Sequence, residues 1–270
     1  MSTVDTRIAS GIAHVRLDRP DKMNAISVAL ANDLQSALQK AGSDPAVSVI
    51  VVSGAGGNFC AGGDVEEVER LRAEGPEQLR TLFEAFRRAC ETVATIDIPV
   101  VAAVQGVAMA GGFELMQAAD IALVRSDAKI ADSHINFGMV PGGGSSQRLP
   151  RLVGRQIATA LLLSGDRLSG LEAVRLGLAY RSYPPTEFDD GVSTFAKKLA
   201  SRDRVAVSTI KRLVGAASRR SLDDGLRDEI DAVVAHICGR GVDEFAKVGG
   251  GPMRPTALAA PRPSQKGTHG

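Results

Sequence analysis

Apolar residues in this chain form short runs separated by longer stretches of helical spacing. Runs at residues 47–52, 100–104 and 121–124 are rich in β-branched residues, as is typical of strands buried on both faces. Residues 12–17 alternate apolar and polar positions, which predicts a further strand, and residues 129–131 are predicted to be extended. These strands are separated by predicted helices, so the pattern favours an α/β fold.

The connecting segments carry the helical pattern. Ser27 is placed to cap a helix that buries Leu30, Leu34 and Leu38 and ends near Gly42. Helices are also predicted over residues 113–119 and 145–163, and residues from 164 onward are predicted to be mostly helical, including 207–213 and 222–237. One more helix is predicted from a single apolar stripe, formed by Leu79, Leu82, Phe83, Phe86, Cys90 and Val93.

Glycine is abundant, with 29 residues, and it clusters at residues 54–64, 106–112 and 141–144. Two of these clusters lie between a predicted strand and a predicted helix, where backbone N–H groups favour a negative charge. If the two loops converge, Gly63 and Gly111 could donate to one oxygen and form an oxyanion hole. The alternative is that these glycines only form tight turns. Neither cluster matches a phosphate-binding loop or the dinucleotide fingerprint.

Composition narrows the function classes. The 270 residues are 44% hydrophobic and 23% charged, which excludes disorder of the whole chain. A net charge of +1, two tyrosines and no tryptophan oppose binding to nucleic acid or an anionic membrane. The first ten residues lack the apolar region of a secretory signal, and no apolar run reaches membrane-spanning length. With three scattered cysteines that oppose a disulfide framework, we expect a soluble cytoplasmic protein.

Glu114 and His134 are the candidate chemical groups. Glu114 lies in the apolar segment MAGGFELMQAAD, where a buried carboxylate is costly unless it is hydrogen-bonded, paired or catalytic; the alternative is a charge that interacts with the helix dipole. His134 precedes the third glycine cluster and could face the same cavity. No histidine spacing typical of a metal site is present. His134 and Asp120 with Ser145 or Ser146 would give a nucleophilic triad, but no G-x-S-x-G motif supports it.

Four motifs occur in one order along the chain: RPDKMNA (19–25), GNFCAGGDV (57–65), VQGVAMAGGFEL (104–115) and FGMVPGGGSSQRL (137–149). In sequence and spacing they resemble the enoyl-CoA hydratase/isomerase, or crotonase, superfamily, from about residue 8 to about residue 245. The resemblance implies a crotonase-like spiral core of ββα turns over residues 1–195 and a helical C-terminal region over 196–248. Residues 249–270 are expected to form a flexible tail.

The resemblance also implies a site. Gly63 and Gly111 match the family's two oxyanion donors, and Glu114 matches the first catalytic glutamate. The second glutamate position is occupied by His134, which could orient water or share in proton transfer.

The implied ligand is an acyl-CoA thioester, with coenzyme A as part of the substrate and no separate cofactor. The implied assembly is a homotrimer or a dimer of trimers. The family's C-terminal pattern is incomplete here, so contacts to the adenine end stay open. The positions matching the family's substrate-binding residues are Lys22, Met23, Ala25, Ala61, Gly63, Asp64, Val65 and Gly111.

The function predicted is that of an enoyl-CoA hydratase, which adds water across the 2,3 double bond through an oxyanion hole. Because His134 replaces the second glutamate, an isomerase, a hydrolase or a C–C lyase acting on an acyl-CoA is the alternative. A non-catalytic protein that binds CoA esters or RNA is a third hypothesis.

Overall fold

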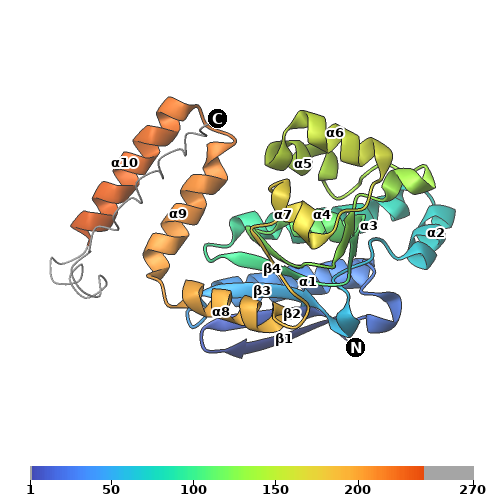
Figure 1. Ribbon diagram of the computed structural model, residues 1–270, viewed down its shortest axis with the longest axis horizontal. Helices are drawn as coiled ribbons and strands as arrows, with labels where there is room; N and C mark the ends of the chain where they lie inside the picture. The colour runs from blue at the N-terminus through green and yellow to red at the C-terminus, as the bar shows by residue number, and fades with distance from the viewer. Residues whose placement is uncertain (1, 240–270) are drawn as a thin grey trace, which may run out of the picture. The chain divides into compact units, whose positions relative to one another are not determined.

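The computed structural model describes residues 2–239, and its framework is one mixed six-stranded sheet in the order β1-β2-β3-β4-β6-β8 (Figure 1). The strands β1 and β2 pair antiparallel, and every other neighbouring pair in this sheet is parallel. Parallel neighbours need crossover connections, which the helices supply. The strands are β1 Val4–Ala9, β2 Ile12–Leu17, β3 Val49–Gly54, β4 Val100–Val104, β6 Ile121–Arg125 and β8 Arg181–Tyr183.

Alternate residues of the central strands enter two different apolar clusters. On β3, Ile50 and Val52 join the main core, whereas Val49 and Val51 face a smaller cluster completed by α8 (Phe188–Ala200). Because both faces are covered, β3 and β4 are almost wholly buried. This accounts for the continuous apolar runs in their sequences.

A second, smaller layer runs beside the main sheet. It contains the parallel strands β5 (Val107–Met109) and β7 (Lys129–Ala131), which single-residue bridges extend at Cys60–Ala108 and Ile130–Leu168. Successive segments of the chain therefore add a long strand to the sheet, a short strand or bridge to this layer, and then a helix. This winding confirms the predicted α/β class, and the Cys60–Ala108 bridge brings the first two glycine loops together at this layer.

The helices predicted near residues 27–42, 79–93 and 113–119 are present as α1, α3 and α4. Ser27 caps α1, since its side chain accepts a hydrogen bond from the Leu30 N–H at 3.1 Å. The helix α4 begins at the second glycine loop, directly after β5. The helices of this part are α1 Val28–Ser43, α2 Val65–Glu74, α3 Pro76–Thr95, α4 Gly111–Ala118, α5 Ser145–Val153, α6 Arg155–Ser164 and α7 Gly170–Arg175, with 3-10 turns η1 Pro20–Lys22, η2 Ala55–Gly57 and η3 His134–Phe137.

One prediction of local structure was wrong, and one short strand was missed. The single helix expected over residues 145–163 is divided into α5 and α6 at Gly154, whose φ of +80° is incompatible with a continuous helix. The region after residue 164 is mostly helical, as predicted, and β8 adds an unpredicted sixth strand beside β6. The strand β8 consists of three residues, Arg181–Tyr183, none of which is fully buried, so no apolar pattern marks it in the sequence.

The chain divides into two compact units, Met1–Gly225 and Leu226–Gly270. The first contains the sheet, α8 and α9 (Arg204–Ala217), and α10 (Leu222–Cys238) begins in it and continues into the second. The boundary predicted between residues 195 and 196 falls inside α8, and the predicted tail at 249–270 lies outside the described residues. Within residues 2–239, the structure has no helix that combines the length and the apolar character needed to cross a bilayer.

Asn24 joins the first loop to the glycine loop after β3. It is fully buried with a φ of +57°, and its amide donates to the carbonyls of Ala55 and Asn58, both at 2.9 Å. Its side-chain oxygen accepts from the Arg19 N–H at 3.0 Å. One buried side chain thus satisfies three backbone groups of two loops.

Replacing Asn24 with alanine should therefore lower the free energy of unfolding by about 2–4 kcal/mol, because buried backbone groups lose their partners. Urea denaturation followed by circular dichroism measures this. The exposed Asp21→Ala variant in the same loop is the control and should change stability little. An Asn24→Ala protein as stable as the parent would show that Asn24 does not hold the loops together.

Candidate active site

The paired strands β5 and β7 bring the two halves of the site together. Met109 and Ala131 are partners in this pair, and the Ala110 N–H donates to the Ala131 carbonyl at 3.0 Å. Ala110 has φ +48° and ψ −117°, a conformation that costs a non-glycine residue free energy. The strained residue turns the chain sharply from β5 into α4, so the helix begins at the site with its N–H groups exposed to it.

Glu114 lies in the first turn of α4 and is only 2% exposed. Its Oε1 accepts hydrogen bonds from the backbone N–H of Gly143 at 2.7 Å and of Ser145 at 3.1 Å. Burial raises the pKa of Glu114, and the two N–H groups and the His134 ring partly oppose this shift. Oε1 is thus fixed by the third glycine loop and the first residue of α5, and Oε2 accepts no hydrogen bond from these groups.

His134 begins η3 and directs its ring at that free oxygen. Its Nε2 lies 3.9 Å from Glu114 Oε2, and its Nδ1 lies 2.7 Å from Asp132 Oδ1. Burial of the ring would lower the pKa of His134, but the hydrogen bond to Asp132 and the charges of Asp132 and Glu114 outweigh it and raise this pKa. The sequence therefore identified two groups that do meet in space.

The gap between His134 and Glu114 has a chemical meaning. A distance of 3.9 Å between Nε2 and Oε2 is too long for a direct hydrogen bond. Both atoms can contact one oxygen atom placed between and beside them at the usual ~2.8 Å. The pair can therefore hold one water molecule or one substrate atom from two sides.

Gly63 and Gly111 lie in loops that touch. A Cβ atom at Gly62 would lie 3.5 Å from the Gly111 nitrogen, and one at Gly111 would lie 2.6 Å from Ile26 Cδ1. Within residues 2–239, neither the Gly63 nor the Gly111 N–H donates to a protein acceptor. Two loops in contact thus each carry one backbone N–H without a protein acceptor, which is the kind of group that an oxyanion hole uses.

The first group of predicted substrate-binding residues lies at the loop after β2. Lys22 is exposed and pairs with Glu66 at 2.7 Å, and Met23 is half exposed with a left-handed φ of +47°. Ala25 is buried, and its carbonyl accepts from the Arg19 side chain at 2.6 Å. Lys22 and Met23 are therefore accessible to a ligand, while Ala25 is buried and its backbone N–H and carbonyl both have protein partners.

The second group lies where the glycine loop enters α2. Asp64 accepts from Arg19 at 2.7 Å and from the Glu67 N–H at 3.3 Å, so it both caps α2 and holds an ion pair. The pKa of Asp64 is lowered, because these partners outweigh its burial. Ala61 donates its N–H to the Met23 carbonyl at 3.0 Å, and Val65 is 73% exposed. The ligand-facing candidate here is Val65, because Asp64 is occupied by structural bonds.

The structure brings forward one residue that sequence reasoning missed. Asp132, rather than Asp120, is the carboxylate beside His134, and it is 1% exposed. Asp120 instead pairs with Lys211 at 2.6 Å and accepts from the Val100 N–H at 2.7 Å. The signal that could have found Asp132 is an aspartate in an apolar segment two residues before a candidate histidine.

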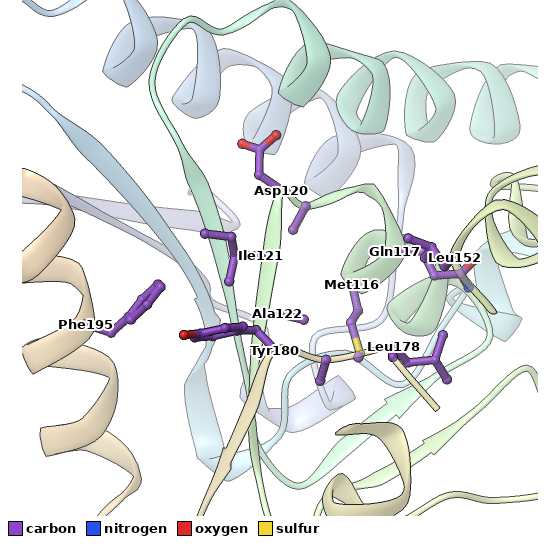
Figure 2. Close-up of a pocket in the computed structure, with 12 residues that line it drawn as sticks. Met116, Gln117, Asp120, Ile121, Ala122, Leu152, Leu178, Tyr180 and Phe195 are labelled. Atoms are coloured by element: carbon purple, nitrogen blue, oxygen red, sulfur yellow. The ribbon is translucent and has the colours of Figure 1, made fainter. Parts of the chain in front are cut away.

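Figure 2 shows a separate pocket at the C-terminal end of α4. Its volume is about 330 Å³. Met116, Gln117 and Leu178 line it, as does Tyr180, whose ring lies 5.5 Å from that of Phe195. Glu114 and His134 are not among its lining residues, so this pocket is distinct from the candidate site formed by those two side chains. Within residues 2–239, no group of three His, Cys, Asp or Glu side chains is arranged to hold a metal ion.

Comparison with known proteins identifies the family to which this chain belongs. The model of the enoyl-CoA hydratase/isomerase family matches residues 7–245. A mitochondrial enoyl-CoA hydratase of Pongo abelii is 33% identical over 215 residues, covering 80% of this chain and 72% of that protein. A peroxisomal Δ(3,5)-Δ(2,4)-dienoyl-CoA isomerase of Arabidopsis thaliana is 32% identical over 227 residues, covering 80% and 82%.

Solved structures agree. The crystal structure of an enoyl-CoA hydratase from Polaromonas sp. JS666 matches with a TM-score of 0.86 at 29% identity, covering 90% of this chain and 96% of that one. One from Bacillus anthracis matches with a TM-score of 0.84 at 30% identity, covering 90% and 93%. The chain belongs to the enoyl-CoA hydratase/isomerase family, which confirms the resemblance seen in its four motifs. Its relatives include both hydratases and an isomerase, so the family alone does not fix the reaction.

The absence of a side chain at Gly143 lets the third glycine loop approach Glu114. A Cβ there would lie 2.6 Å from Glu114 Oε2 and would collide with the Phe86 ring. Gly143→Ala should therefore lower the free energy of unfolding by about 1–3 kcal/mol, as overpacking does, and displace the loop from Glu114. Thermal and urea unfolding measure the loss. The control is Gly215→Ala in α9, where a Cβ meets nothing within 4 Å; equal stability of the two variants would contradict this account.

Proposed function

We propose that this protein is an enoyl-CoA hydratase that adds water across the 2,3 double bond of an acyl-CoA thioester. Membership of the family supports an acyl-CoA substrate. The observation that carries the reaction is the pair of Glu114 Oε2 and His134 Nε2, which lie 3.9 Å apart and can contact one water. An acid and a base on one water molecule are what hydration needs.

The thioester oxygen is bound by the N–H groups of Gly63 and Gly111. Attack of water on the β-carbon pushes the electrons of the double bond toward the thioester, and negative charge develops on its oxygen. Two fixed backbone donors stabilise that charge, and each oxyanion donor is worth roughly 3–4 kcal/mol of barrier. The N-terminus of α4, where Gly111 lies, adds its dipole in the same direction.

The protons are moved by Glu114 and His134. Glu114 Oε2 takes one proton from the water as the oxygen bonds to the β-carbon. The α-carbon of the resulting enolate then takes a proton from His134 Nε2. The reaction thereby adds one H and one OH, and leaves Glu114 protonated and His134 neutral.

The alternatives of isomerisation, hydrolysis and C–C cleavage use the same oxyanion hole and differ in their products. Incubation with a panel of acyl-CoA esters followed by mass spectrometry separates them. Hydration adds the mass of water, hydrolysis releases free CoA, cleavage gives two smaller products and isomerisation leaves the mass unchanged. Hydration is the expected result, and any other product would overturn this assignment.

Glu114→Gln tests the base. The glutamine oxygen can still accept from Gly143 and Ser145, so the fold should persist, but the amide cannot take a proton. Turnover should fall by about 10²–10⁴-fold while acyl-CoA binding is retained. Steady-state kinetics and calorimetric titration with a substrate analogue measure the two. The matched control is Glu91→Gln, which removes an exposed carboxylate paired with Arg87 on α3; parent-like turnover in Glu114→Gln would remove Glu114 from the mechanism.

The remaining parts of the proposal concern cofactor, location and assembly. The steps above need no group besides the thioester, so no further cofactor is proposed. A cytoplasmic location is proposed from the sequence, although the names of relatives include mitochondrial and peroxisomal proteins. Self-assembly is supported by apolar side chains that stand exposed on α9, namely Val205, Ile210 and Val214.

We propose a homotrimer or a dimer of trimers. The chain mass is 28.2 kDa, so light scattering after size exclusion should report about three or six times this value. Ile210→Asp with Val214→Asp should shift the mass toward the monomer, because charge would enter the apolar contact. A monomeric parent protein would contradict the proposed assembly.

A further inference from the structure

Asp132 is a buried carboxylate that the proposed reaction does not itself use. It is 1% exposed, and its Oδ1 lies 2.7 Å from His134 Nδ1. Its Oδ2 is buried and has no hydrogen-bond partner within residues 2–239. Burying a carboxylate with one oxygen unpaired is costly, so its presence calls for a compensating interaction. The ring of His134 is the one recorded hydrogen-bond partner of this side chain in the described residues.

The backbone fixes where Asp132 stands. It directly follows β7, whose last residue, Ala131, is paired with Met109 of β5 and accepts from the Ala110 N–H. His134 comes two residues later at the start of η3. Asp132 is therefore attached to the same two-stranded layer that starts the Glu114 helix, and only Ser133 separates it from His134.

We propose that Asp132 is a positioning residue that holds His134 as a protonated imidazolium, with Nδ1–H directed at Asp132 and Nε2–H directed at Glu114 Oε2. This inference rests on the proposed function in one respect, that His134 donates the proton to the α-carbon. The placement itself follows from the contacts of 2.7 Å and 3.9 Å on the two sides of the ring.

The charges around the ring support a cation. Glu114 faces it from α4 and Asp132 from the end of β7, so two carboxylates surround one imidazole. Near Glu114, the Cys90 thiol of α3 stays neutral because burial raises its pKa to about 12. Arg148 of α5 donates to the Gly143 carbonyl at 2.5 Å, on the loop that holds Glu114. Consistent with this balance, the pKa of His134 lies above its ordinary value despite burial of the ring.

This arrangement also returns the site to its starting state. After one turnover Glu114 carries the proton taken from water, and His134 is neutral. Glu114 Oε2 and His134 Nε2 are 3.9 Å apart, so a small movement or one water lets the proton pass back to the ring. The Asp132 carboxylate favours that transfer by stabilising the imidazolium, and no proton need come from bulk solvent.

The direct test is the pKa of His134, measured by NMR titration of the imidazole C–H signals in the full chain. The chain has four histidines, so His134→Gln assigns the signal by its loss. Asp132→Asn keeps the size of the side chain and removes its charge, and should lower the pKa of His134 by about 1–3 units. Asp127→Asn is the matched control, since it removes an exposed carboxylate paired with Arg125, and should leave this pKa unchanged.

The kinetic test uses the pH profile of turnover. The rate should rise as Glu114 loses its proton and fall as His134 loses its own, so Asp132→Asn should move the falling limb to lower pH by the shift that NMR reports. At neutral pH its turnover should drop on the order of 10-fold or more. In the His134→Gln background, Asp132→Asn should have little further effect on turnover, because Asp132 acts through the ring.

The outcomes separate this inference from the proposed function. An unchanged His134 pKa in a folded Asp132→Asn protein, with melting temperature checked by circular dichroism, would overturn the positioning role whatever reaction is catalysed. An equal fold-loss in both backgrounds would also overturn it, since a purely structural defect adds to the loss of His134. A shifted pKa combined with a product other than the hydrated thioester would uphold Asp132 and reject hydration.

Discussion

The structure depends on the hydrogen bonds that two backbone N–H groups donate to one oxygen of Glu114. The carboxylate is almost completely buried, so without Gly143 and Ser145 it would be unstable there as an anion. Their bonds fix Oε1 and leave Oε2 free, and burial still raises the pKa. A carboxylate with one oxygen held in place and a raised pKa is suited to take a proton on its other oxygen.

That interaction requires three segments far apart in the sequence to approach at backbone distance. Ala110 accepts a strained conformation so that α4 can start at the end of β5, and Gly143 lacks a side chain so that its N–H can reach Glu114. Gly62 and Gly111 likewise allow their loops to touch. The donors that we propose for the ligand oxygen, the Gly63 and Gly111 N–H groups, are thus main-chain groups of these loops.

His134 gives this site a character that two carboxylates would not have. Two acids close together must share their charge, so one is protonated at the expense of the other. An imidazole between Asp132 and Glu114 can be cationic while both neighbours are anionic, which separates the proton donor from the proton acceptor. In the reaction that we propose, the proton donor and the proton acceptor are then distinct chemical groups whose opposite charges stabilise each other.

The sequence by itself determined the α/β class, the buried strands β3, β4 and β6, the capped start of α1, and the four motifs that place the chain in its family. These follow from local periodicity and from glycine, whose positions are dictated by backbone geometry. It also singled out Glu114 and His134, because charged or titratable groups in apolar segments stand out against their neighbours. The short strand β8 and the break at Gly154 were missed, since three residues carry no period and a single glycine does not reveal its φ.

Only the tertiary structure decided which groups meet. Asp132 and Asp120 look alike in sequence, and the pairing of β5 with β7 puts the first against His134 while α9 supplies Lys211 to the second. The tertiary structure likewise showed that Asp64 pairs with Arg19 and caps α2. It also showed that, within residues 2–239, the Gly63 and Gly111 N–H groups have no protein acceptor. Such facts depend on distances between segments distant in the chain, and local sequence patterns hold no information about those distances.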